Sequence, residues 1–476
     1  MTTQQFLPLS GTLQLCAGIG VIALFADGHD EQRLWQLALY AVLAAGALLR
    51  GLPGLLNAPE QRGLRWSLAG FFACGAVSAL FAFSARHALL EMAMLLMLLL
   101  ASLFIAQEIS RNRTAGLALV LQTCAIGCAA YALKVALLYT AAVSNHIQPG
   151  VEIFAPGFSN YRFLNHAQTV ALPLLVLLCV LVKSRIARCG VFALTAFWWA
   201  LLFLTTGRGT MIGIAAGCVV ALVLRRRHAY GYCKAMVVTA CGGLAIYALL
   251  FALLPMALGL GPAGLLGAVA QRTAIDPTSA RLPLWTRALE LIAAHPVLGA
   301  GPMHFGHYAI DIQNGAHPHN WILQIGAEWG IPGLLFLCAA IGYALRSLLR
   351  TAPRIAAGDA GNQHMLAAWI AIGAAILVDG LVSGLLVMPV SQLWIALYIG
   401  CAAGWTLSLR GSGSGGERRR ANLLPGAVLM LLAAAGIAIG VAPELPQRVR
   451  NEPLSAREAA MYNGYGHPRI WLAGYF

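Results

Sequence analysis

Apolar runs of about 20 residues recur along nearly the whole chain. This is the length that a helix needs to cross the hydrocarbon core of a membrane. The period-2 alternation of a membrane barrel strand does not recur. The pattern predicts an all-α polytopic membrane protein with about 12–13 transmembrane helices. The predicted spans lie near residues 11–26, 35–55, 66–84, 87–107, 116–142, 167–182, 188–205, 210–224, 235–255, 330–349, 365–385, 390–409 and 423–443.

Longer polar segments divide the chain into four parts. Residues 1–255 hold the first spans, 256–328 form a long loop with a candidate catalytic motif, 329–443 hold the C-terminal spans, and 444–476 form a short tail. A second polar stretch, "GFSNYRFLNHAQ", lies within residues 145–166, and "RGSGSGGERRRAN" is expected to be a flexible linker.

The long loop has a helical pattern of its own. Trp285, Ala288, Leu289 and Ile292 follow i, i+3, i+4, i+7 spacing, which makes one apolar face. We expect an amphipathic helix lying on the membrane surface. The sequence "HPVLGAG" then ends this helix with proline and glycines.

Composition agrees with a membrane protein, because 59% of residues are hydrophobic and only 10% are charged. Soluble domains carry roughly 25% charged residues. The formal net charge of +14 is concentrated in alternate loops, so it indicates membrane orientation and not a nucleic-acid partner. Basic residues crowd one set of loops: Arg50, Arg62, Arg65, Arg111, Arg113, Lys183, Arg185, Arg188, Arg225, Arg226, Arg227, Lys234, Arg346, Arg350, Arg354, Arg410, Arg418, Arg419 and Arg420.

The alternate loops hold few basic residues, namely Arg33, Arg86, Arg162, Arg208, Arg272, Arg281 and Arg287. By the positive-inside rule the N-terminus is cytoplasmic, and the loop at 256–328 faces outward.

No cofactor or metal site is expected from the sequence. The eleven cysteines lie mostly within apolar runs, and Cys124 and Cys128, which share a helix face, are interpreted as packing residues. No Gly-rich phosphate loop or HExxH motif occurs. The acidic residues of the outward loops are sparse and form no pair that would hold a divalent ion: Glu152, Asp276, Glu290 and Asp311.

The stretch "GAHPHNWILQIGAEWGIPGLL", from Gly315 to Leu335, places polar groups where a span begins. A helix that starts just after Pro318 puts Asn320, Gln324 and Glu328 on one face, pointing into a cavity near the outer surface. His319 at its start is a candidate proton acceptor, because histidine titrates near neutral pH. His317 is a supporting candidate that Pro318 is expected to turn away. The alternative is a polar cap that only satisfies backbone groups.

Outward arginines form the second candidate group, since guanidinium suits phosphate oxygens. Arg208 lies between two glycines in "TTGRG", Arg281 opens the amphipathic helix, and Arg162 lies in the earlier outward segment beside His166. The alternative is lipid-headgroup binding or snorkelling. Arg287 is expected to pair with Glu290, a structural contact.

Two ionisable residues fall inside predicted spans, Lys134 and Asp379. Such groups are functional candidates by default. They form a buried structural pair, or each faces a polar cavity separately; both readings remain open.

Residues 280–335 resemble a known family. "SARLPLWTRALELIAAHPVLGAG" followed by "HPHNWILQIGAEWGIPG" is similar to the signature region of the superfamily of O-antigen ligases, O-antigen polymerases and O-oligosaccharyltransferases, and "TTGRG" is similar to a further element. The resemblance implies a GT-C-like fold and metal-independent, inverting glycosyl transfer. It also implies a glycan on undecaprenyl diphosphate as donor, with His319 as the essential histidine and Arg208 and Arg281 as the matching arginines.

Among the activities of the superfamily we favour O-antigen ligation to lipid A–core in lipopolysaccharide biosynthesis. Only a short segment follows the last span, whereas protein-glycosylating relatives often carry a large C-terminal region, and polymerases usually match the "HPHN" region less well. Protein O-oligosaccharyl transfer and O-antigen polymerisation are the alternatives within the family. A transporter or flippase is the alternative from another class, and it would place ionisable groups at mid-membrane.

Overall fold

The structure is a computed structural model that describes residues 10–50, 59–264, 280–312, 315–410, 423–450, 452 and 469–472. Within these ranges the regular elements are all helices, and ten are long and apolar enough to cross a membrane. Ser10–Phe25 and Val428–Val441 are shorter apolar helices. The predicted all-α polytopic membrane fold is confirmed. Arg272, Asp276 and the linker 411–422 lie outside the described residues.

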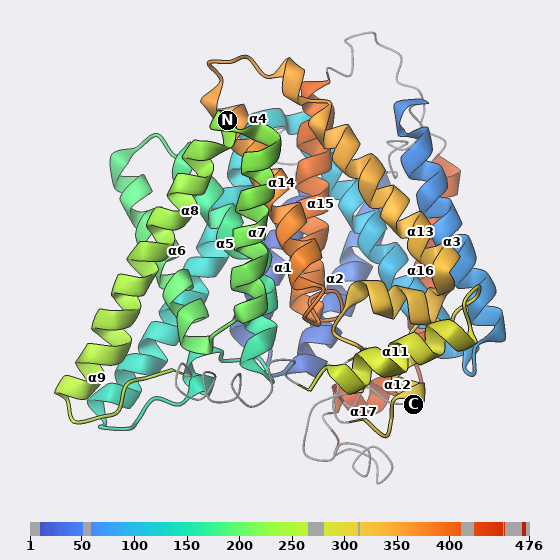
Figure 1. The fold of residues 1–476 in the computed structure, drawn as a ribbon, viewed down its shortest axis with the longest axis horizontal. Coiled ribbons are helices and arrows are strands. Elements are labelled where there is room, and N and C mark those ends of the chain that lie inside the picture. The colour runs from blue at the N-terminus through green and yellow to red at the C-terminus, as the bar shows by residue number, and fades with distance from the viewer. Residues whose placement is uncertain are drawn as a thin grey trace.

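The helices run between two ends of the molecule, called here the upper and lower ends as drawn in Figure 1. The long helices are α1 (Ser10–Phe25), α2 (His29–Arg50), α3 (Arg62–Phe81), α4 (Ala85–Ser144), α5 (Tyr161–Leu181), α6 (Arg185–Thr205), α7 (Arg208–Arg225), α8 (Arg227–Ile246), α11 (Leu282–Ala294), α13 (Trp321–Leu349), α14 (Ala360–Asp379), α15 (Pro389–Leu409) and α16 (Leu423–Val441). The short helical pieces are η4 (Pro59–Gln61), η5 (Val151–Phe154), η6 (Tyr247–Leu253), α9 (Leu254–Ala257), α12 (Phe305–Tyr308), η7 (Ala352–Arg354) and α17 (Leu445–Val449).

Helix α4 covers two predicted spans in one continuous element of 60 residues, so the loop expected around Arg111 is helical. It rises from the lower end, bends at the upper end and descends again (Figure 1). The backbone N–H of Thr12 donates to Glu108 Oε2 at 2.7 Å near the bend. Lys134 Nζ donates to the Leu24 carbonyl at 2.6 Å near the lower end. Helix α1 therefore packs along the descending arm.

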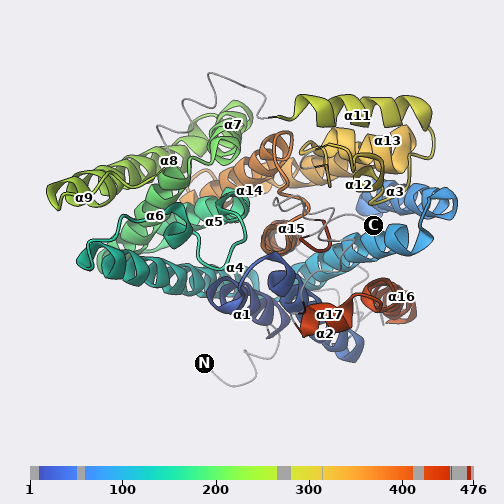
Figure 2. The same cartoon turned by 90° about the horizontal axis from the view of Figure 1, so that it is seen from below.

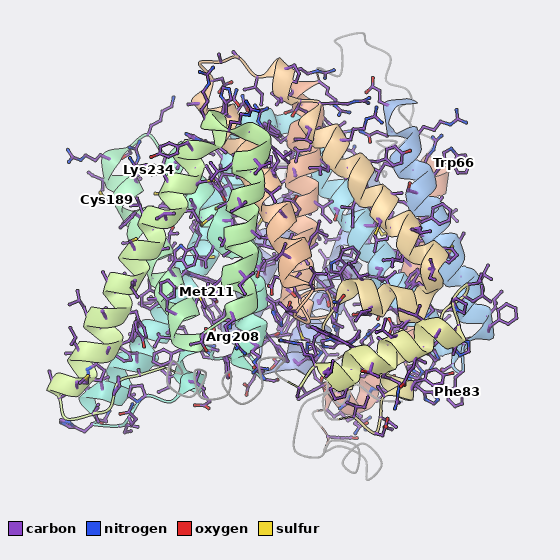
Figure 3. The ribbon with its side chains drawn as sticks, in the orientation of Figure 1. Trp66, Phe83, Cys189, Arg208, Met211 and Lys234 are labelled. Atoms are coloured by element: carbon purple, nitrogen blue, oxygen red, sulfur yellow. The ribbon has the colours of Figure 1, made fainter. Side chains whose placement is uncertain are left out.

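The two predicted sets of loops lie at opposite ends of the helices. Figure 3 places Trp66, Cys189 and Lys234 toward the basic-rich upper end, and Phe83 and Arg208 at the lower end. One assignment was wrong: Arg33 is a buried residue of α2, because that helix begins at His29, earlier than the hydropathy pattern predicts.

Helix α13 is broken at Gly330, whose φ of 75° and ψ of 170° are not helical. The "HPVLGAG" turn packs into the break: the backbone N–H groups of Ala300 and Gly301 donate to the carbonyls of Ala327 and Glu328 at 2.8 and 3.1 Å. A Cβ on Gly330 would lie 2.2 Å from the Val297 carbonyl oxygen, so only glycine fits. The break leaves residues 321–329 as a short helix that precedes the rest of α13.

Helix α11 is amphipathic as predicted, and part of its apolar face is buried within the protein. Leu284, Ala288 and Leu291 are buried, with Trp285 and Ile292 packed beside them. Leu289, which the pattern places on the apolar face, is 56% exposed. The face packs on α12 and α13, which fixes α11 across the lower end (Figure 2).

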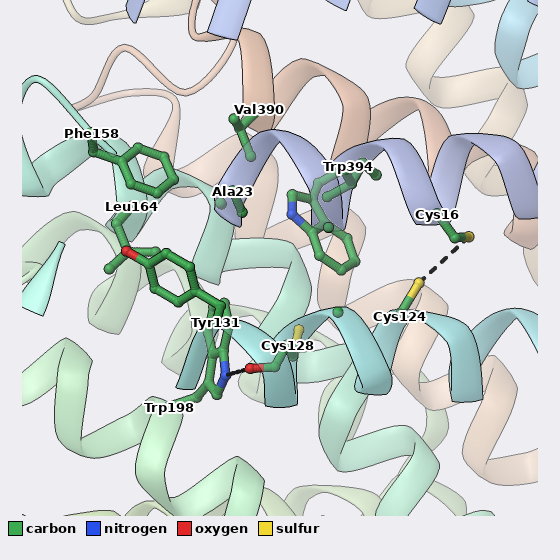
Figure 4. Close-up of a pocket in the computed structure, with 14 residues that line it drawn as sticks. Cys16, Ala23, Cys124, Cys128, Tyr131, Phe158, Leu164, Trp198, Val390 and Trp394 are labelled. Carbon is green, nitrogen blue, oxygen red and sulfur yellow. Dashed lines mark hydrogen bonds between the residues drawn. The ribbon is translucent and has the colours of Figure 1, made fainter. Parts of the chain in front are cut away.

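The cysteines of the described residues form no disulfide. Cys124 Sγ donates to Cys16 Sγ at 3.6 Å, and Cys128 is buried beside them. All three cysteines line an apolar pocket between α1, α4 and α15, together with Tyr131, Trp198 and Trp394 (Figure 4). The interpretation of these cysteines as packing residues agrees with this arrangement.

Candidate functional site

The predicted polar stretch forms a loop, residues 315–320, at the lower end between α12 and α13; we call it the histidine loop. His319 has φ of 53°, in the left-handed region that costs a non-glycine residue roughly 1–2 kcal/mol. Such strain persists only where surrounding contacts impose it, and it gathers at functional sites. His319 is partly exposed, whereas His317 is buried.

Neighbouring helices fix the histidine loop from two sides. Trp285 Nε1 of α11 donates to the Pro318 carbonyl at 3.0 Å. The Trp321 backbone N–H donates to the Gly380 carbonyl at 3.0 Å, which ties the loop to the end of α14. The side chain of Asn320 caps α13, with Oδ1 accepting from the N–H groups of Ile322 and Leu323 at 3.0 and 3.2 Å.

His317 does not turn away from His319, and that expectation was wrong. The two ring centroids are 4.0 Å apart. The His319 backbone N–H donates to His317 Nδ1 at 3.3 Å, so this nitrogen carries no proton. His317 therefore acts locally as a support for His319, in spite of Pro318 between them.

The pKa of His319 is held well below its usual range. Burial contributes most, followed by the positive charge of Arg281 and then by His166 and Arg162. His319 is therefore a neutral imidazole with cationic neighbours, the state that a proton acceptor needs. Arg281 and Arg162 come from separate segments of the chain, and both lie close enough for their charges to act on His319.

The "TTGRG" turn presents Arg208 at the start of α7. Thr205 Oγ1 donates to Asn165 Oδ1 at 2.7 Å, and Thr210 Oγ1 donates to the Asn165 carbonyl at 2.9 Å. A Cβ on Gly209 would lie 2.5 Å from Asp379 Oδ1, so the glycine lets α7 approach α14. Arg208 is partly buried at the lower end (Figure 3).

Asp379 connects the Arg208 turn to the rest of the site. Its Oδ2 accepts from Thr169 Oγ1 at 2.6 Å, and Arg281 lies within electrostatic range of the carboxylate. Asp379 is the last residue of α14 and so lies at the lower end, not at mid-membrane. The predicted alternative of a Lys134–Asp379 pair was wrong, because Lys134 donates to the end of α1 instead.

The face formed by Asn320, Gln324 and Glu328 has a mainly structural role, which corrects the expectation of a cavity lining. Asn320 is the helix cap, Gln324 is buried, and Glu328 is fully buried. Glu328 Oε2 forms an ion pair of 2.6 Å with Arg469 Nη2, and Oε1 accepts from the Phe305 N–H at 3.1 Å. The alternative of a polar cap thus describes Asn320 correctly.

Arg287 pairs with Glu290 at 3.1 Å, as predicted, and with Asp311 at 3.0 Å. Arg162 is exposed, and its guanidinium lies 6.0 Å from the centre of the Tyr161 ring.

Sequence reasoning missed the contribution of Trp285, which it placed only on an apolar face. It also missed Arg469, for which no local pattern gives a signal.

Residues 190–338 match the family model described as O-antigen ligase. This match covers about a third of the chain, and it shows that this region is similar to the O-antigen ligase superfamily. A search of curated proteins gave no match. The matched region contains Arg208, Arg281 and the whole histidine loop. The superfamily supports an O-antigen ligase- or polymerase-type function and implies a polyprenyl-linked glycan as substrate.

Proposed function

We propose that this protein is an O-antigen ligase, a glycosyltransferase that moves a glycan from undecaprenyl diphosphate to lipid A–core in lipopolysaccharide biosynthesis. The observation that carries the proposal is the neutral His319 with arginine neighbours at one end of an all-helical membrane bundle. The family match over residues 190–338 supports the chemistry. The lower end then faces the periplasm, with the N-terminus in the cytoplasm and the bundle in the inner membrane.

The reaction joins an acceptor sugar hydroxyl to the anomeric carbon of the donor glycan. His319 accepts the hydroxyl proton as the new carbon–oxygen bond forms. The bond between the anomeric carbon and the diphosphate breaks, and attack from the opposite face inverts the centre. Arg208, Arg281 and the more exposed Arg162 stabilise the negative charge that grows on the leaving diphosphate.

The direct test is ligation by purified protein given an undecaprenyl-diphosphate glycan and lipid A–core. We expect glycosylated lipid A–core to form, also in excess EDTA, because arginines carry the diphosphate charge in place of a divalent ion. Elongation of the glycan on the polyprenyl lipid would favour polymerisation, and transfer to a protein would favour O-oligosaccharyl transfer. Activity lost in EDTA and restored only by Mg²⁺ or Mn²⁺ would contradict the metal-independent route.

The orientation can be tested with topology reporters. We expect fusions after Arg226 and Arg354 to report the cytoplasm, and a fusion after Gly261 to report the periplasm, because basic residues crowd the upper end. All three positions lie in described segments between or beyond helices. A periplasmic signal after Arg226 would reverse the orientation and move the proposed site to the cytoplasm.

The depressed pKa of His319 predicts an unusual pH profile. A general base becomes protonated and inactive as the pH falls through its pKa. Because the pKa of His319 is lowered, the transfer rate should stay constant as the pH falls below ~6.5, where an ordinary histidine becomes protonated. Arg281→Ala removes a charge that lowers this pKa, so the acidic limb of the rate profile should move to higher pH. Arg287→Ala is the matched control, since Arg287 pairs with Glu290 and Asp311. Equal shifts in both variants would contradict the assignment of His319 as the titrating base.

A further inference from the structure

A four-residue segment of the C-terminal tail, residues 469–472, contacts the histidine loop and helices α2, α4 and α13. Arg469 is fully buried, and its Nη2 lies 2.6 Å from Glu328 Oε2 and 3.0 Å from Glu91 Oε1. Its Nη1 donates to the Ala316 carbonyl at 3.4 Å, directly before His317. One guanidinium thus joins α4, α13 and the histidine loop.

A second buried arginine, Arg33 of α2, holds this segment in place. Arg33 Nε donates to the Ile470 carbonyl at 3.1 Å, and Nη2 donates to the Arg469 carbonyl at 2.9 Å. The same Nη2 donates to the Val387 carbonyl at 2.7 Å, in the turn between α14 and α15. This turn also contacts the histidine loop, because a Cβ on Gly384 would lie 2.6 Å from the His317 ring. The segment 469–472 is therefore linked both to the start of the histidine loop and, through Arg33, to the turn between α14 and α15 that packs against His317.

The charges of this cluster balance, with Arg33 and Arg469 against Glu91 and Glu328. A buried ion pair adds little net stability compared with apolar residues of the same volume, since desolvation opposes the attraction. Removing one partner is nevertheless strongly unfavourable, because a buried charge is left uncompensated. Such a cluster is thus better explained by the geometry that it imposes than by stability.

We propose that Arg469 is a positioning residue for the transfer reaction, which holds the histidine loop in its working geometry through Ala316 and Glu328. Glu328 passes this constraint on to α12 through the Phe305 N–H. Arg469 lies outside the region that matches the family model, so this role comes from the contacts of this chain. The inference rests on the proposed ligase function and adds a part of the protein that lies far from the histidines in sequence.

The test is to compare donor binding and turnover in Arg469→Ala and Arg469→Lys with the wild-type protein. A misplacement of about 1 Å in a catalytic group can cost about 100-fold in rate. We expect kcat to fall about 100-fold in Arg469→Ala and less in Arg469→Lys, with the affinity for undecaprenyl diphosphate unchanged. Donor affinity should persist because Arg208 and Arg281 are intact.

The matched control is Arg450→Ala, since Arg450 lies earlier in the tail, has a side chain that is 72% exposed, and pairs with the exposed Glu452 at 3.3 Å. Its kcat should equal that of the wild type. If Arg469→Ala does not accumulate in the membrane, Arg469→Lys decides, because lysine keeps the charge but cannot reach all three partners at once. A folded lysine variant with wild-type kcat would overturn the proposal. Absence of transfer by the wild-type protein would instead refute the ligase function itself.

The pH profile provides a readout that a purely structural role would not change. The pKa of His317 is held low by burial first, and then by its neighbours His319, Arg469, His166 and Arg281. Arg469→Ala removes a cation but leaves the carboxylates of Glu91 and Glu328, so the pKa of His317 should rise. Protonation of His317 Nδ1 breaks its hydrogen bond from the His319 N–H. The acidic limb of kcat should therefore move to higher pH; an unchanged limb together with wild-type kcat would contradict the inference.

Discussion

His319→Ala is expected to reduce glycan transfer by about 10²–10⁴-fold while the protein remains folded and inserted, because general base catalysis contributes a factor of this size. The histidine loop does not depend on the His319 side chain for its position. Its attachments come from Trp285, which donates to Pro318, from Trp321, which donates to Gly380, and from the Asn320 cap. The measurement is ligation of the polyprenyl-diphosphate glycan to lipid A–core, with donor binding assayed separately.

His317→Ala is the companion variant, and it should reduce turnover less than His319→Ala. His317 acts through the backbone of His319, as the acceptor of its N–H, and not on the substrate. His317→Asn keeps an acceptor and should recover part of the loss. Added imidazole should partly restore His319→Ala, since a small base can enter the space of the ring.

Two results would remove His319 from the base role. One is near-normal turnover in His319→Ala. The other is loss of donor binding alone, which would make His319 a ligand of the diphosphate.

The helices could be predicted from the sequence because membrane spans depend on local composition. Alternate loops differ in basic content, and the structure places them at opposite ends. The break in α13 was not predicted, although "EWGIPG" contains the glycine and proline that permit it. Whether such a sequence breaks a helix depends on a partner, here the "HPVLGAG" turn that binds the freed carbonyls.

The site could be predicted only in part, because a helical pattern gives the face of a residue and not its partner. His319, Arg281 and Arg162 follow from polar groups in an apolar chain, and electrostatic interactions connect them in the structure. Glu328 was assigned to a cavity on the same reasoning, yet it pairs with Arg469, which is 141 residues further along the chain. Contacts at such separations are tertiary and leave no periodic signal.

Arg208→Ala and Arg281→Ala are each expected to reduce kcat/KM for the donor by about 10²–10³-fold. Removing one preorganised partner of a developing negative charge typically costs about 2.7–4 kcal/mol. Arg208→Lys and Arg281→Lys should lose less, because lysine keeps the charge but not the bidentate geometry. The alanine variants should also bind undecaprenyl diphosphate more weakly, which separates them from His319→Ala.

The folds of these arginine variants should be intact, which makes the comparison direct. The turn that carries Arg208 is held by the hydroxyls of Thr205 and Thr210, not by the arginine side chain. Arg281 precedes α11, whose buried face is formed by Leu284, Ala288 and Leu291. Arg287→Ala on the same helix controls for loss of a cation there and should be milder than either alanine variant, because Arg287 already pairs with Asp311. Near-normal donor use in all four variants of Arg208 and Arg281 would exclude both residues from the diphosphate site and leave His319 without its proposed partners.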